Sequence, residues 1–178
     1  MYQSVLQFWF EVLTPAQWWQ KNKALDDEIR RRFGDVHRRA CLGECFEWRT
    51  RATGRLAEII VLDQFSRHIY RDQPAAFAAD GMALVLAQEA ISAGAERELT
   101  RQQRVFLYMP MMHSESLKVH DVALALFEKN EVADNLAFER RHRDIIARFG
   151  RYPHRNAILG RESTAEEMAF LQQPGSGF

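Results

Sequence analysis

Apolar residues recur along the chain at spacings of three and four positions, which is the pattern of helices that bury one face. The clearest run covers residues 56–65, where the apolar stripe widens before it ends at Phe65. Further amphipathic helices are predicted over residues 75–93, 101–112, 117–128 and 135–149, and in a short segment after residue 163. No segment alternates apolar and polar residues as a half-buried strand does. The pattern predicts an all-α fold of about seven to nine helices, in a single domain over residues 1–178.

Residues that start and stop helices mark the boundaries of these runs. Thr100 is positioned to cap the helix that follows it, and Gly150 occupies the position where a left-handed residue ends a helix. Ser163 and Glu166 have the spacing of a capping box, which predicts that Ser163 caps the last helix. The longest irregular stretch, residues 150–162, has a length at which ordered loops are often functional.

Composition and charge narrow the class of protein. Hydrophobic residues make up 47% and charged residues 27% of the chain, which is ordinary for a soluble globular domain. Lys and Arg together number 24, as do Asp and Glu, and this zero net charge argues against a general nucleic-acid binder. Twenty of the 24 basic residues are Arg, the side chain best suited to bidentate carboxylate or phosphate contacts. A GC-rich genome would give the same bias.

The sequence predicts a cytoplasmic protein. Cys41 and Cys45 are the only cysteines, too few for a disulfide framework, and at four residues apart they are expected to share a helix face. No secretory signal is recognised near the start. No stretch reaches the roughly 18 apolar residues that a membrane span needs. We therefore expect neither a membrane nor a nucleic acid as a partner.

The end of the first apolar run carries a group of polar side chains. Asp63 and Arg67 are four residues apart, at the spacing of a stabilising ion pair on one helix. Asp63 follows strongly apolar residues, and a carboxylate buried among them needs a partner. Two interpretations stay open. Asp63 and Arg67 form a buried ion pair that ties two helices together, or Asp63, Gln64 and Arg67 form one wall of a polar pocket.

A second group follows Pro110, which is expected to kink or end its helix. His113 and Glu115 lie just past that break, and a His side chain titrates near neutrality, which suits acid–base chemistry. The alternative is that His113 caps or hydrogen-bonds a neighbouring helix. His113 and His120 could share a face, but their spacing matches no established zinc motif. No metal and no cofactor are therefore predicted.

The third group is rich in arginine. Residues 140–161 carry seven Arg against one Asp in an otherwise neutral protein. The ligand-binding candidates in this segment are Arg151, Arg155, Asn156 and Arg161, and His154 is an acid–base candidate. The segment leads into the predicted last helix, whose free N–H groups would favour an anion. The alternative is that these arginines pair with Asp63, Glu115 and other carboxylates, and so fix the loop to the helical body.

Several strings in the sequence are specific enough to suggest a family. They are Leu-Asp-Gln-Phe at residues 62–65, His-Ser-Glu at 113–115 and Phe-Gly-Arg-Tyr-Pro-His-Arg-Asn at 149–156. In this order, and over nearly the whole chain, they resemble the bacterial family called "domain of unknown function 924". The resemblance implies a fold similar to tetratricopeptide repeats, an α-α superhelical array, and no assigned activity. Ser66, His68 and His120 depart from the family pattern, in which Pro, Asn and Gln are usual.

Three functions are compatible with these residues. The first is a binding module whose groove, lined by Arg, His and acidic side chains, takes a small anion or the carboxylate of a peptide. The second is an enzyme, a hydrolase or lyase acting on an anionic metabolite, with Asp63, His113, Glu115 and His154 as candidate catalytic residues. No known nucleophile motif accompanies them. The third is a structural or interaction protein with a buried salt-bridge network. All three require the three polar segments to meet in the fold, and the sequence leaves the oligomeric state open.

Overall fold

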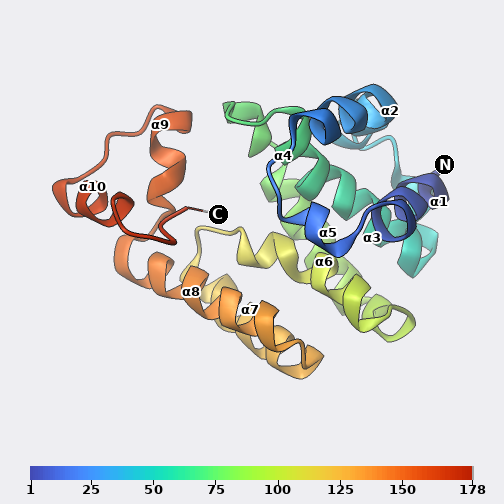
Figure 1. Ribbon diagram of the computed structural model, residues 1–178. Coiled ribbons are helices and arrows are strands. Elements are labelled where there is room, and N and C mark those ends of the chain that lie inside the picture. Colours follow the sequence, from blue (N-terminus) through green and yellow to red (C-terminus); the bar gives the residue numbers. More distant parts are fainter. Residues whose placement is uncertain (178) are drawn as a thin grey trace.

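The computed structural model describes residues 1–177, and these residues form helices and loops without a strand. The α-helices (Figure 1) are α1 (Tyr2–Gln7), α2 (Lys23–Cys41), α3 (Ala52–Ile60), α4 (Ser66–Ile69), α5 (Asp80–Ser92), α6 (Arg101–Met112), α7 (Leu117–Asn130), α8 (Ala133–Phe149), α9 (Asn156–Leu159) and α10 (Ala165–Leu171). A π-helical turn, Val61–Phe65, joins α3 to α4 without a break, so the described residues contain nine separate α-helices. The prediction of an all-α fold is confirmed.

Two helix boundaries lie where capping residues in the sequence predict them. α6 begins after Thr100, whose hydroxyl accepts the backbone N–H of Gln103 in a capping box. α8 ends at Gly150, which has a φ of 68° in the left-handed region that glycine adopts without strain. The helix predicted over residues 75–93 instead begins at Asp80, because Pro74–Ala76 form a separate 3₁₀ turn before it.

Two predictions of local structure are wrong. Thr164 and not Ser163 caps α10, since the Thr164 hydroxyl accepts the N–H of Glu167 and the Glu167 carboxylate accepts the N–H of Thr164. Cys41 is the last residue of α2 and Cys45 lies beyond the turn that follows, so the two thiols do not share a helix face.

The main core is built around α3 and the π-turn. Every residue from 56 to 66 is buried, because α1, α5 and α6 pack against α3 and α2 covers the π-turn and α4. Aromatic rings fill the space between these helices. The ring of Trp9 meets Phe65 at 5.7 Å and Phe106 at 5.5 Å, edge to face. The polar residues at the end of this buried run must find their partners inside the protein.

The second half of the chain adds a layer beside this core. α6, α7 and α8 pack against one another in sequence order, and the segment with α9 and α10 lies at one end of them (Figure 1). A small apolar cluster of Ile145, Ile146 and Tyr152, covered by Phe149 and Phe170, joins that segment to α8. This packing brings Arg155 of the segment to His113 and Asp80, beside the π-turn that carries Asp63.

One segment is an exception to the prediction that no stretch is long and apolar enough to span a membrane. Pro74–Ser92 is long and apolar enough to pass a test for a membrane span by length and composition. In the structure, α5 occupies most of this segment and buries Ala83, Ala87 and Ala90 against the core. A single helix of this kind is weak evidence for a span, and 28% of the window is buried in the protein.

Candidate functional site

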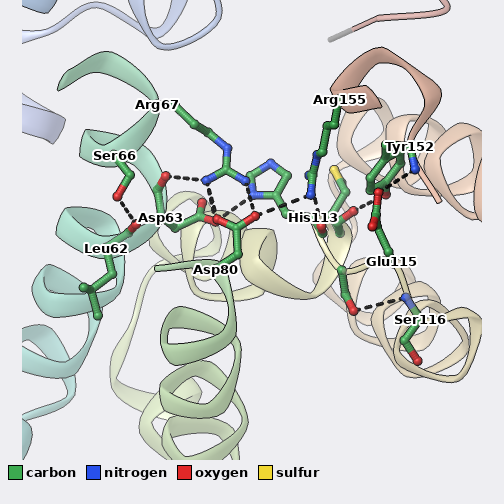
Figure 2. Close-up of polar contacts among 12 residues, drawn as sticks. Leu62, Asp63, Ser66, Arg67, Asp80, His113, Glu115, Ser116, Tyr152 and Arg155 are labelled. Atoms are coloured by element: carbon green, nitrogen blue, oxygen red, sulfur yellow. Dashed lines mark hydrogen bonds and ion pairs between the residues drawn. The ribbon is translucent and has the colours of Figure 1, made fainter. Parts of the chain in front are cut away.

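The three polar segments meet at one place. Asp63 lies on the π-turn, His113 follows the last residue of α6, and Arg155 lies in the segment after α8. Oδ1 of Asp63 lies 2.7 Å from Nδ1 of His113, and Nη2 of Arg155 donates to the backbone oxygen of His113 at 3.0 Å. Figure 2 shows these side chains converging from three different elements. Residues 50 and 42 positions apart in sequence are thus in direct contact.

Asp63 and His113 form a buried pair with a defined charge. The Asp63 side chain is 1% exposed. Burial acts to raise its pKa, but the charges of His113 and Arg67 and hydrogen bonds from His113 and Gln64 lower it below the ordinary value. Burial and the charge of Arg67 lower the pKa of His113, against the attraction of Asp63. At neutral pH the pair is therefore an ionised carboxylate that accepts a hydrogen bond from Nδ1–H of a neutral imidazole.

Arg67 is held by a carboxylate that the sequence did not point to. Asp80, the first residue of α5, accepts both guanidinium Nη groups of Arg67 at 2.9 and 3.0 Å. Nη1 of Arg67 also donates to the backbone oxygen of Asp63 at 2.7 Å. Asp80 was missed because it follows an Ala-rich stretch and meets its partner only through the packing of α5 against the π-turn.

Arg155 has weaker contacts with carboxylates than Arg67 has. Its side chain is 8% exposed and lies over the rings of Phe77, at 4.7 Å, and Tyr152, at 4.6 Å. Nη1 reaches Asp80 only at 3.5 Å, and the buried Nε has no hydrogen-bond partner among the described residues. Burial and the neighbouring charge of Arg67 lower the pKa of Arg155. A guanidinium with no carboxylate in close contact attracts an anion, because its charge is only partly compensated.

Arg67, His113 and Arg155 line one large cleft with a volume of about 1220 Å³. Five of the predicted site residues contribute to its wall, namely Gln64, Arg67, His113, His154 and Arg155. Nδ1 of His113 is used by Asp63, while its Nε2 has no hydrogen-bond partner among the described residues. Burial and the charge of Arg155 lower the pKa of His154 to about 4, so this imidazole is neutral as well.

Five predicted site residues lie outside the cleft wall, namely Asp63, which is paired with His113, and four others whose contacts are as follows. Arg151 pairs with Glu167 at 2.7 Å. Arg161 pairs with Glu115 at 2.7 Å, and the same carboxylate accepts the backbone N–H of Tyr152. Asn156 donates to the hydroxyl of Ser163 and accepts from Arg161. The contacts with Glu115 fix residues 150–167 to the helical body, and the others hold this segment together, as the structural alternative for this part of the arginine-rich segment expects.

The start of α10 does not offer the anion site that its position suggested. This helix has only seven residues, and its first turn is occupied by its own Thr164 and Glu167. The Glu167 carboxylate accepts two hydrogen bonds from Arg151 as well as the N–H of Thr164, so an acid of the chain itself holds the place predicted for an anion.

His120 is not part of the site. It is fully buried on α7, where its Nδ1 lies 2.7 Å from Oε1 of Glu139 and its Nε2 lies 2.8 Å from the backbone oxygen of Ser114. Within residues 1–177, no three His, Cys, Asp or Glu side chains gather so that they could hold a metal ion.

Comparisons with known proteins extend these observations. The family model described as "Bacterial protein of unknown function (DUF924)" matches residues 5–175. The solved structure of a protein of unknown function, ATU0120 from Agrobacterium tumefaciens, is similar with a TM-score of 0.92 and 36% sequence identity, over 96% of each chain. No curated protein matches the chain.

Proposed function

The chain belongs to the family of bacterial proteins described as DUF924, and we propose that it binds a small anionic molecule in the cytoplasm, with Arg155 and Arg67 as the anion contacts. The observation that carries this proposal is the state of Arg155. Its guanidinium lies in the cleft wall between two aromatic rings, and the carboxylate paired with it, that of Asp80, is 3.5 Å away, so its charge is incompletely compensated. Arg67 lies beside it with its planar face already oriented by Asp80.

The charges around Arg155 favour a monoanion. Arg67 and Arg155 carry two positive charges, Asp63 and Asp80 carry two negative charges, and His113 is neutral at the pKa that burial gives it. A carboxylate adds one negative charge to this balanced group, which uptake of a proton by His113 would compensate. A dianionic phosphate would leave more uncompensated charge in a buried place, which is costly. The carboxylate of a peptide is one form that such a ligand takes, and a tetratricopeptide-like superhelix, which stays a prediction, would favour it.

The test is thermal unfolding of the full chain with sodium acetate, malonate and phosphate at neutral pH. A ligand at 100 times its dissociation constant stabilises by about 2.7 kcal/mol, which for this size corresponds to roughly 5–10 °C in Tm. Arg155→Met keeps an apolar stem between the two rings and removes the charge, and it should remove the shift. Arg148→Met is the matched control, since Arg148 forms an exposed pair with Glu166 away from the cleft. The absence of any shift in the wild type, or an undiminished shift in Arg155→Met, would contradict the proposal.

A second candidate function is an enzyme that acts on the bound anion. The observation in its favour is the Asp63–His113 pair, in which an ionised carboxylate orients a neutral imidazole whose Nε2 is unused in a cleft-lining residue. Such an imidazole accepts a proton from water or from a ligand, and the carboxylate stabilises the imidazolium that results. A hydrolase or lyase is the reaction class that this pair would serve.

Its test uses whichever acid the unfolding screen identifies. Incubation with the protein and mass spectrometry of the mixture would reveal turnover. His113→Asn keeps a hydrogen-bond donor for Asp63 and removes the base, so it should stop turnover while binding persists. An intact ligand after prolonged incubation with the wild type would favour the binding module alone.

A further inference from the structure

The cleft is much larger than a bare anion needs. Its volume of about 1220 Å³ lies above the roughly 300–1,000 Å³ of pockets that enclose a whole drug-sized ligand. Arg67 and Arg155 account for only one part of its wall. Away from them, most of the surface of the wall is apolar, with the side chains of Trp18, Trp19, Phe106, Met109, Phe138 and Ile158 among its members, and charged side chains such as Lys21, Arg71 and Arg101 also lie in it.

Two of these rings are exposed in a way that ordinary packing does not explain. Trp19 is 54% and Phe138 is 45% exposed, although both are large apolar side chains in the wall of a cleft. Apolar surface gathered in a concave place marks a binding site more often than scattered apolar residues do. The two rings come from distant elements, since Trp19 follows the first 3₁₀ helix, Pro15–Trp18, and Phe138 belongs to α8.

The Trp19 ring is also supported on one side. It stacks on the ring of Phe106, with centroids 5.8 Å apart and an angle of 8° between the planes. Phe106 is itself 1% exposed and meets Trp18 edge to face at 5.0 Å. One face of the Trp19 indole is therefore covered by the core, and a preformed platform of this kind binds an apolar group at a low cost in side-chain entropy.

We propose that the ligand of this cleft is a carboxylic acid with a bulky apolar body, whose carboxylate contacts Arg155 and Arg67 and whose body covers Trp19 and Phe138. This inference rests on the proposed function, since it needs the anion contact as its anchor. The arginines (Figure 2) supply the charged end of the site, and the exposed rings supply the apolar remainder. The balanced charges of Asp63, Asp80 and the two arginines favour a single carboxylate as the charged group.

The experiment is isothermal titration calorimetry of the full chain with three probes. Phenylacetate has the charge and the body, acetate has only the charge, and phenylacetamide has the body without the charge. Burial of a phenyl ring should make phenylacetate bind about 10- to 100-fold more tightly than acetate. Phenylacetamide should bind at least tenfold more weakly than phenylacetate, because its neutral amide forms no charged contact with the arginines.

Two variants locate the apolar body. Trp19→Ala should weaken phenylacetate about tenfold and leave acetate unchanged, and Phe138→Ala serves as a second variant should the first be poorly folded. Phe46→Ala is the matched control, since Phe46 is 61% exposed and lies outside the cleft wall. The control should leave the affinities for all three probes as they are in the wild type.

The outcomes separate the two proposals. Equal affinity for acetate and phenylacetate, or an undiminished phenylacetate affinity in both cleft variants, overturns the apolar body and leaves anion binding intact. Equal affinity for phenylacetate and phenylacetamide overturns the anion contact and with it the proposed function. Binding of none of the probes overturns both.

Discussion

Replacing Asp63 with alanine tests whether the Asp63–His113 pair stabilises the fold. The substitution removes a fully buried carboxylate and leaves the Nδ1–H of His113 and the amide of Gln64 without their acceptor. It also takes a carboxylate away from the charge of Arg67, whose Nη1 lies 3.5 Å from Oδ1 of Asp63. Breaking a buried ion pair by removing one partner costs about 3–5 kcal/mol. Asp63→Asn keeps an acceptor for His113 and loses only the charge, so it should cost about 1.5–3 kcal/mol, the range of a hydrogen bond to a charged group.

Urea denaturation at pH 7.5, followed by circular dichroism, gives these free energies directly. The corresponding loss in Tm for Asp63→Ala is roughly 6–20 °C, at about 2–4 °C per kcal/mol. Asp27→Ala is the matched control, because Asp27 forms an exposed pair with Lys23 and should contribute less than about 1 kcal/mol. The pKa of Asp63 is lowered in the folded state, so its contribution is present at neutral pH and is lost as pH falls below about 4. A cost for Asp63→Ala as small as that of the control would refute the reasoning.

Two further predictions concern the body of the protein. Burial lowers the pKa of His142 to about 3 and that of His154 to about 4. As pH falls, the unfolded chain therefore takes up protons at these two residues before the folded chain does, and the stability of the fold should decline below about pH 6.5. A Tm that stays constant between pH 6.5 and 4.5 would contradict this prediction. Gly54→Ala should destabilise the fold by about 1–3 kcal/mol, measured by denaturation, because a Cβ at this position would lie 2.1 Å from the backbone oxygen of Trp48. This cost is expected although alanine normally favours a helix over glycine. Equal or greater stability of the variant would show that the backbone moves freely there.

Helix limits could be predicted from sequence where one residue decides them, and not where neighbours compete. Thr100 and Gly150 end their helices as local chemistry requires. At the last helix, Ser163 and Thr164 both carry a hydroxyl with a Glu three residues later. Asn156 donates to the Ser163 hydroxyl, a contact that only the folded loop provides, and Thr164 is left as the cap.

The central residues of the candidate site could be predicted from the sequence, but the contacts that surround them could not. Asp63, His113 and Arg155 stand out in the sequence because each places a polar group beside an apolar run or a helix break, and the fold brings the three together. Nothing local separates Arg155 from Arg161, since the difference lies in whether a carboxylate such as Glu115 happens to face them. The contribution of the exposed aromatic rings to the cleft depends entirely on the packing of distant helices.

The π-turn at Val61–Phe65 has a consequence for how this chain tolerates insertions and deletions. A π-turn holds about one residue more than an α-turn, so the face that follows it is rotated by roughly 100° relative to a regular helix. α3 thereby faces α1 and α6, while α4 faces α2. Loss of a single residue here would restore a regular helix and turn Ser66–Ile69 away from α2, so a one-residue deletion within Val61–Phe65 should disrupt the packing of α4.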